Sequence, residues 1–112
     1  MKRKKMLDIS FSNHELYRGC KVREFERGRF RLETPLDSAV VFVAHNALSL
    51  AERFAKEGFD TLELTGGVPP AIYMTVFSIM SPFFTEVIHV DGHTKTYTGI
   101  PKPPAGFMSE PE

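Results

Sequence analysis

The stretch AVVFVAHNALSLAERFAKEGFDTLELTGGVPPAIYMTVFSIMSPFFTEVIHV, residues 39–90, decides the predicted fold. It begins with residues 39–44 (AVVFVA), a continuous apolar and largely β-branched run that is typical of a strand buried on both faces. Asn46 is a good N-cap for a following helix, because its side chain accepts from a first-turn amide, and Gly58 suits that helix's end. The predicted elements are strand 39–44, a helix between Asn46 and Gly58, strand 61–64, a helix over 70–80 and strand 87–90.

Sequence on either side of this stretch extends the pattern. It predicts a first strand over 6–11, a hairpin of strands 20–26 and 29–33 around Arg27-Gly28, and a short edge strand over 94–98. Strands that alternate with helices imply a mostly parallel, right-handed sheet in three layers. We therefore expect a small Rossmann-like α/β domain over residues 1–99, with an N-terminal β-hairpin, and a proline-rich tail over residues 100–112.

The helix expected over residues 70–80 is apolar almost all the way round. Pro69 and Pro70 suit its start, because the backbone N–H groups of the first turn have no acceptor within a helix. The N–H that proline lacks therefore costs no hydrogen bond there. One sheet face does not cover so apolar a helix in a small protein. We expect a homodimer interface through it; the alternative is burial within the monomer under the tail and the hairpin.

Composition limits the function classes. The chain has 112 residues, enough for one domain with one core. The single cysteine, Cys20, excludes an intrachain disulfide and fits a reducing cytosol. There is no apolar run of about 18 residues and no secretory signal, so we expect a cytoplasmic protein with no membrane partner.

Charge is unevenly distributed although the net charge is zero. Residues 1–31 carry ten Lys/Arg and four Asp/Glu, a balance of +6, and residues 32–112 carry the opposite balance. This asymmetry indicates an anionic partner for the N-terminal third. The alternative is a solvated hairpin preceded by a basic leader. We expect no stable binding of duplex nucleic acid.

Polar residues and glycines follow each predicted parallel strand. Ligands of open α/β sheets bind outside the carboxyl ends of the strands, so these residues are the candidate site. His89, inside the strand 87–90, is interpreted as structural. The candidates are Ser12, Asn13 and His14; His45 and Asn46; Thr65, Gly66 and Gly67; and Asp91 and His93.

Thr65-Gly66-Gly67 precedes a helix N-terminus, where backbone amides favour an anion such as phosphate. Neither the Walker pattern nor the dinucleotide fingerprint is present. A plain strand–turn–helix connection is the alternative. His14, His45, Asp91 and His93 include the types that bind zinc or manganese, but acid–base work by one or two histidines is the commoner role.

The segments LELTGGVPPAIYM (62–74) and ISFSNH (9–14) resemble the CRISPR-associated Rossmann-fold (CARF) proteins and the related stand-alone ring nucleases. That family has a strand followed by Thr-Gly-Gly and a helix. It often continues with Thr-Lys, where this chain has Val68-Pro69. The resemblance implies binding of a cyclic oligoadenylate across a homodimer, with Thr65, Gly66 and Gly67 in the ligand loop.

The leading hypothesis is therefore a metal-independent ring nuclease in antiviral defence, with no cofactor. His14, His45 and Asp91 are its expected catalytic residues, and the RNA supplies its own 2′-hydroxyl nucleophile. The ligand is expected to contact Ser12, Asn13, Asn46, Thr65, Gly66, Gly67 and His93. Two alternatives stay open: a metal-dependent phosphohydrolase using the His/Asp set, and a non-enzymatic nucleotide-sensing or protein-interaction module whose basic N-terminal region touches nucleic acid.

Overall fold

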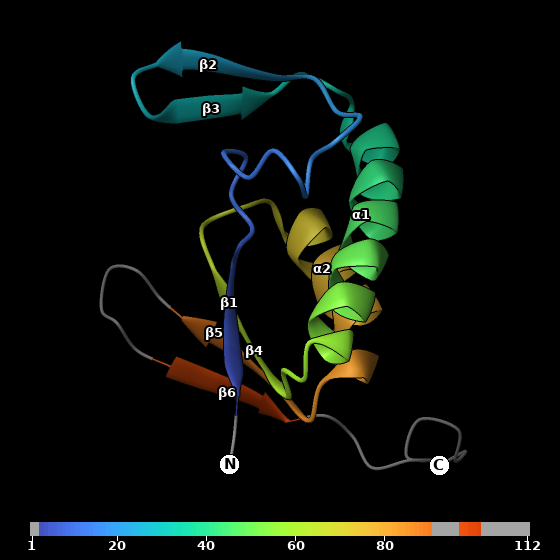
Figure 1. Ribbon diagram of the computed structural model, residues 1–112. Coiled ribbons are helices and arrows are strands. Elements are labelled where there is room, and N and C mark those ends of the chain that lie inside the picture. Colours follow the sequence, from blue (N-terminus) through green and yellow to red (C-terminus); the bar gives the residue numbers. More distant parts are fainter. Residues whose placement is uncertain (1–2, 91–96, 102–112) are drawn as a thin grey trace, which may run out of the picture.

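The computed structural model describes residues 3–90 and 97–101. The chain forms six strands, two α-helices and one short 3₁₀ helix in this part (Figure 1). Their order is β1 (Lys4–Asp8), β2 (Val22–Glu26), β3 (Arg29–Leu32), α1 (Leu36–Lys56), β4 (Thr61–Thr65), α2 (Pro70–Met80), η1 (Ser81–Phe83), β5 (Glu86–Val90) and β6 (Tyr97–Pro101).

Four of the strands form one sheet in the order β1-β4-β5-β6. β1, β4 and β5 are mutually parallel, and β6 pairs antiparallel with β5 at the edge. Across the parallel strands, Leu7 pairs with Leu64, and Leu64 pairs with His89. β2 and β3 form a separate antiparallel hairpin. The prediction of a small α/β domain with a mostly parallel sheet and an N-terminal hairpin is confirmed.

Both helices lie on the same side of the sheet (Figure 1). The strand order explains this, because β1, β4 and β5 follow one another in one direction and right-handed crossovers then place their helices on one face. On the opposite face, Met6 of β1 is largely exposed, although its neighbour Glu63 of β4 is buried. The described residues thus form two layers, and the third layer and the homodimer stay predictions.

The predicted strand over residues 39–44 is wrong, because these residues belong to α1. The deciding signal is the spacing of the buried residues, which recur every three to four positions. The apolar run itself is only half buried: Val41 is 66% exposed, although Val43 is fully buried. The buried positions of α1 are Ala39, Val43, Ala47, Leu50, Ala51 and Phe54.

Local sequence also favours a helix from residue 36 onward. Pro35 immediately precedes α1, and no proline or glycine interrupts the chain until Gly58. Asp37 lies in the first turn, where the helix dipole favours a negative charge. Gly58 has a φ of 91° and follows the last turn, so its predicted role at the helix end is confirmed. The parallel part of the sheet therefore has three strands instead of four.

The other predicted elements are confirmed with small shifts. β1 begins two residues before the predicted start at residue 6 and ends three before the predicted end at residue 11. The helix over 70–80 matches α2. The edge strand predicted over 94–98 overlaps β6 (Tyr97–Pro101) at residues 97 and 98, and its residues 94–96 lie outside the described part of the chain. Neither helix in the described part of the chain has the length and hydrophobicity needed to cross a bilayer.

A segment between β1 and β2 is tied to α1 by Asn46. The Asn46 Nδ2 donates to the carbonyl oxygens of Leu16 and Arg18, at 2.8 and 2.9 Å. Arg53, two turns further along α1, makes a bidentate hydrogen-bonded ion pair with Glu15, at 2.7 and 3.2 Å. The guanidinium of Arg53 lowers the pKa of the Glu15 carboxyl. Asn46 thus anchors this loop instead of capping a helix.

Asn46→Ala is expected to destabilise the protein by about 1–3 kcal/mol, because two loop carbonyls lose their donor and one of them is partly buried. Urea unfolding followed by circular dichroism measures the change. Ser49→Ala, at an exposed position of the same helix, is the control and should change stability by less than about 0.5 kcal/mol. Equal effects of the two substitutions would contradict the anchoring role of Asn46.

Candidate functional site

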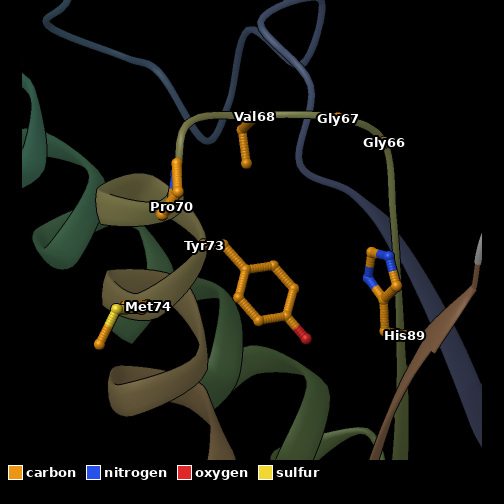
Figure 2. Close-up of a pocket in the computed structure, with 7 residues that line it drawn as sticks. All are labelled: Gly66, Gly67, Val68, Pro70, Tyr73, Met74 and His89. Carbon is orange, nitrogen blue, oxygen red and sulfur yellow. The ribbon is translucent and has the colours of Figure 1, made fainter. Parts of the chain in front are cut away.

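A pocket of about 510 Å³ lies between the β4–α2 loop, the start of α2 and β5 (Figure 2). It is at the carboxyl end of β4, the edge at which ligands of parallel sheets bind. Its volume falls within the range of roughly 300–1,000 Å³ that is typical of small-molecule sites. The lining residues are Gly66, Gly67, Val68, Pro70, Tyr73, Met74 and His89.

The two glycines at the mouth of the pocket have different roles. Gly66 has a φ of 104°, and a Cβ there would lie 2.7 Å from Asp8 Oδ1 and 3.0 Å from the Ser10 nitrogen. Gly66 is therefore required for the loop to pass the end of β1. A Cβ at Gly67 would meet no atom of the described residues within 4 Å. Packing does not require a glycine at position 67, so the missing side chain leaves the backbone accessible from the pocket.

His89 is the pocket residue that sequence reasoning missed. It pairs with Leu64 and shares a face with Val87, so its side chain points toward the helix layer. Its Nδ1 is buried and has no hydrogen-bond partner in the described part of the chain. The available signal was strand alternation. Residues 87 and 89 lie on the same face of the strand, and Val87 marks that face as apolar, so a histidine at position 89 is unexpected there.

Tyr73 of α2 faces His89 across the pocket (Figure 2). Their ring centroids lie 5.4 Å apart with the planes at 80°, an edge-to-face contact. Burial raises the pKa of the Tyr73 hydroxyl, so this group stays protonated well into the alkaline range and remains a hydrogen-bond donor. The pocket thus combines an uncharged donor and an imidazole with the apolar side chains of Val68 and Met74.

Ser12 belongs to a second polar group, at the end of β1 beside Gly66. Its Oγ lies 2.8 Å from the Ser10 Oγ and 3.4 Å from Asp8 Oδ2. The Ser10 amide donates to Asp8 Oδ1 at 2.9 Å, which fixes the carboxylate. This group borders the glycine loop but does not line the pocket.

The structure does not bring the next two candidates into the pocket. Asn13 uses its amide within the turn after β1: Nδ2 donates to the Asp8 carbonyl at 2.6 Å, and Oδ1 accepts from the Glu15 and Leu16 amides. His14 is exposed on the same turn. Asn13 is accounted for as a structural residue.

His45 and Asn46 lie on α1, because the strand expected to end before them is part of that helix. His45 is exposed and borders a separate hollow of about 160 Å³ with Arg18 and Arg53. The prediction that His45 and Asn46 follow a strand is therefore wrong, and neither residue lines the pocket of Gly66 and Gly67.

Of the other candidates, Thr65 ends β4 beside the glycines and is partly buried, while Asp91 and His93 lie outside the described residues. The carbonyl oxygen of Thr65 accepts a hydrogen bond from the Ile9 amide at 2.8 Å, which holds the ends of β1 and β4 together. Within residues 3–90 and 97–101, no three His, Cys, Asp or Glu side chains are grouped so that they could hold a metal ion.

Substitution at the two glycines separates their roles. Gly66→Ala is expected to destabilise the protein by about 1–3 kcal/mol, because alanine disfavours the positive φ and its Cβ meets Asp8. Gly67→Ala should be neutral or stabilise by up to about 1 kcal/mol, because the unfolded chain loses freedom and no contact opposes the methyl group. Urea unfolding measures both, and a large loss at Gly67 would contradict the assignment.

Comparison with protein-family models, curated proteins and solved structures finds no match to this chain. The geometry of the pocket and of the surfaces around it is therefore the basis on which a function is proposed.

Proposed function

We propose that the pocket beneath Gly66 and Gly67 binds a nucleotide-containing ligand, and that this ligand is a cyclic oligoadenylate, as the resemblance implies. The observation that carries the proposal is that three features meet at this pocket. There, an accessible glycine backbone, a buried imidazole nitrogen with no partner among the described residues, and apolar walls meet at the carboxyl end of the sheet. Such a combination suits a ligand that is part anion and part flat apolar ring.

The two parts of a nucleotide suit different sides of this pocket. A phosphate can approach the backbone at Gly67, where no side chain intervenes. Pro69 and Pro70 have no backbone N–H and cannot donate to a phosphate, so the phosphate contacts are assigned to the loop before them. The side chains of Val68, Tyr73 and Met74 offer apolar surface to a base.

His89 is the proposed proton donor for cleavage. In this reaction the ligand's own 2′-hydroxyl attacks the adjacent phosphorus, and the bond from phosphorus to the 5′-oxygen breaks. The imidazolium of His89 gives its proton to the leaving 5′-oxygen, and the 2′-hydroxyl proton passes to water, so charge and atoms balance. His89 recovers its proton from solvent. The products are a 2′,3′-cyclic phosphate and a 5′-hydroxyl, and no metal is required.

Tyr73 has a supporting role in this proposal. Its hydroxyl stays protonated because burial raises its pKa, so it can donate to a phosphate oxygen on which charge develops. The edge-to-face contact with Tyr73 also fixes the orientation of the His89 ring. The earlier assignment of catalysis to His14, His45 and Asp91 is replaced in this proposal by His89 and Tyr73.

The outer surface of α2 supports a homodimer as part of the proposal. Met74 at the rim of the pocket is 65% exposed, and a shallow hollow along α2 is formed by Tyr73, Met74, Phe77 and Ser78. Two copies in contact through this surface would bring their pockets next to each other. A cyclic oligonucleotide, which is larger than one pocket, would then lie across the two-fold axis.

Chromatography of cyclic tri-, tetra- and hexa-adenylates incubated with the protein, with and without EDTA, tests binding and cleavage together. Linear products that persist in EDTA are expected. His89→Gln should lower the cleavage rate by about 10²–10⁴-fold, because one proton-transfer group is lost, while affinity by calorimetry changes only a few-fold. Gly67→Val should weaken binding at least tenfold, because a branched side chain at this lining position shields the backbone from the ligand.

Ser49→Ala on α1, which does not line the pocket, is the control and should behave as wild type. Products that disappear in EDTA would favour the metal-dependent alternative. Binding without products would leave a nucleotide sensor. Intact ligand with no measurable binding would contradict the proposed function altogether.

Met74→Glu is expected to convert a dimer into a monomer in sedimentation velocity, because two buried carboxylates would face each other near the two-fold axis. Val41→Glu on α1 is the matched control, since Val41 is 66% exposed but lies outside the proposed interface. A wild-type protein that is monomeric at all concentrations tested would exclude the dimer.

A further inference from the structure

The hairpin of β2 and β3 extends away from the sheet, above its carboxyl edge and next to the start of α1 (Figure 1). Paired residues of an antiparallel ladder point to the same face. Val22 pairs with Leu32, and both are partly buried. The next pair, Arg23 and Arg31, therefore lies on the opposite face, where both residues are exposed.

A β-bulge adds an aromatic side chain to this arginine-rich ribbon. The register shifts between Glu24 and Glu26, so Phe25 is the extra residue of β2. Phe25 is 47% exposed, and the guanidinium of Arg31 lies over its ring, 5.0 Å from the centroid. Arg29 is two residues before Arg31 on β3, so it shares the arginine face.

Electrostatics at this surface are unfavourable in the free protein. Two arginines directly opposite each other repel. The nearby carboxylates compensate weakly: Glu33 lies 3.8 Å from both Lys21 and Arg23, and Glu26 lies 3.7 Å from Arg29. The side chains of all three cations are 70% exposed or more, and pairs of this kind contribute little and exchange readily. Residues 21–33 contain five Lys/Arg and three Glu, so the hairpin has a cationic excess.

The hairpin also borders a groove of about 630 Å³ that Phe11, Phe25, Phe30, Arg31 and Pro69 help to line. Exposed aromatic rings beside arginines form the surface on which unpaired bases stack while phosphates are neutralised. A duplex hides its base faces, and an acidic peptide has no flat ring for Phe25 to stack on. This combination therefore favours single-stranded nucleic acid over the other polyanions.

We infer that the β2–β3 hairpin binds single-stranded RNA or DNA, with Arg23, Arg29 and Arg31 on the phosphates and a base stacked on Phe25. Arg23, Phe25, Arg29 and Arg31 do not line the pocket of Gly67 and His89, although Pro69 of the β4–α2 loop borders the neighbouring groove. The inference does not depend on the function proposed for that pocket. Within the basic N-terminal region, the hairpin is then the part that contacts the nucleic acid.

Fluorescence anisotropy of a labelled 12-nucleotide oligouridylate, titrated with the full chain at several salt concentrations, tests the inference. Uridylates suit the test because their bases are little stacked on one another. The double variant Arg23→Gln/Arg31→Gln is expected to weaken binding at least tenfold. Its slope of log affinity against log salt should fall by about 1.4, because each lost phosphate contact accounts for about 0.7.

Phe25→Leu separates stacking from charge. It keeps an apolar side chain but removes the ring, so affinity should fall about fivefold or more with an unchanged salt slope. Lys56→Gln, which removes an exposed positive charge at the far end of α1, is the control and should bind as wild type. Gly67→Val should also bind the oligouridylate as wild type, which distinguishes this site from the pocket.

Three results would overturn the inference. The first is no binding by the wild-type chain at low salt, and the second is wild-type affinity of the double variant. The third is equal affinity for a 12-base-pair RNA duplex or for polyglutamate with no effect of Phe25→Leu. This last result would make the hairpin a general polyanion surface without base stacking.

Discussion

Four apolar side chains on one face of the sheet, Leu7, Leu62, Leu64 and Val87, pack under both helices and hold the fold together. Each is at most 5% exposed. The opposite face of β4 is covered as well, because Thr61 and Glu63 there are at most 7% exposed, but the apolar cluster lies on the helix side. This packing determines which side chains of α1 and α2 point inward, and it sets the position of the β4–α2 loop over the strand ends.

The pocket follows from a single interruption of that apolar face. His89 occupies the position after Val87 on the same side of β5, next to Leu64 of β4. Open α/β sheets usually bind ligands where successive crossovers diverge to opposite faces. Here both helices lie on one face, so there is no such divergence between β1, β4 and β5 (Figure 1). The pocket instead lies between α2 and the sheet, where an imidazole replaces an apolar side chain.

Prolines and glycines at the ends of helices and strands made part of this structure predictable. Pro69 and Pro70 mark the start of α2, Gly58 the end of α1, and Arg27-Gly28 the hairpin turn. The strand predicted over 39–44 failed because an apolar run looks alike in a buried strand and in a helix. Only its continuation to Phe54 at helical spacing distinguishes them. Because of that error, His45 and Asn46 were expected at the end of a strand and hence in the candidate site. His89 was not among the candidate residues because its place in the pocket depends on the residue that faces it. That residue is Tyr73, which belongs to another element, α2.

The pairing of β1 with β4 has a consequence for how the molecule is made. The two strands are joined by the whole hairpin and α1, and the Arg3 amide bonds to the Asp60 carboxylate 57 residues away. β1 is thus synthesised before β4 and cannot pair with it until β4 exists. Closing so long a loop costs chain entropy before the contacts between β1 and β4 can stabilise the chain, and this slows folding. In the interval β1 is an unpaired strand of the nascent chain, and the like charges of Lys4 and Lys5 disfavour its pairing with another copy of itself.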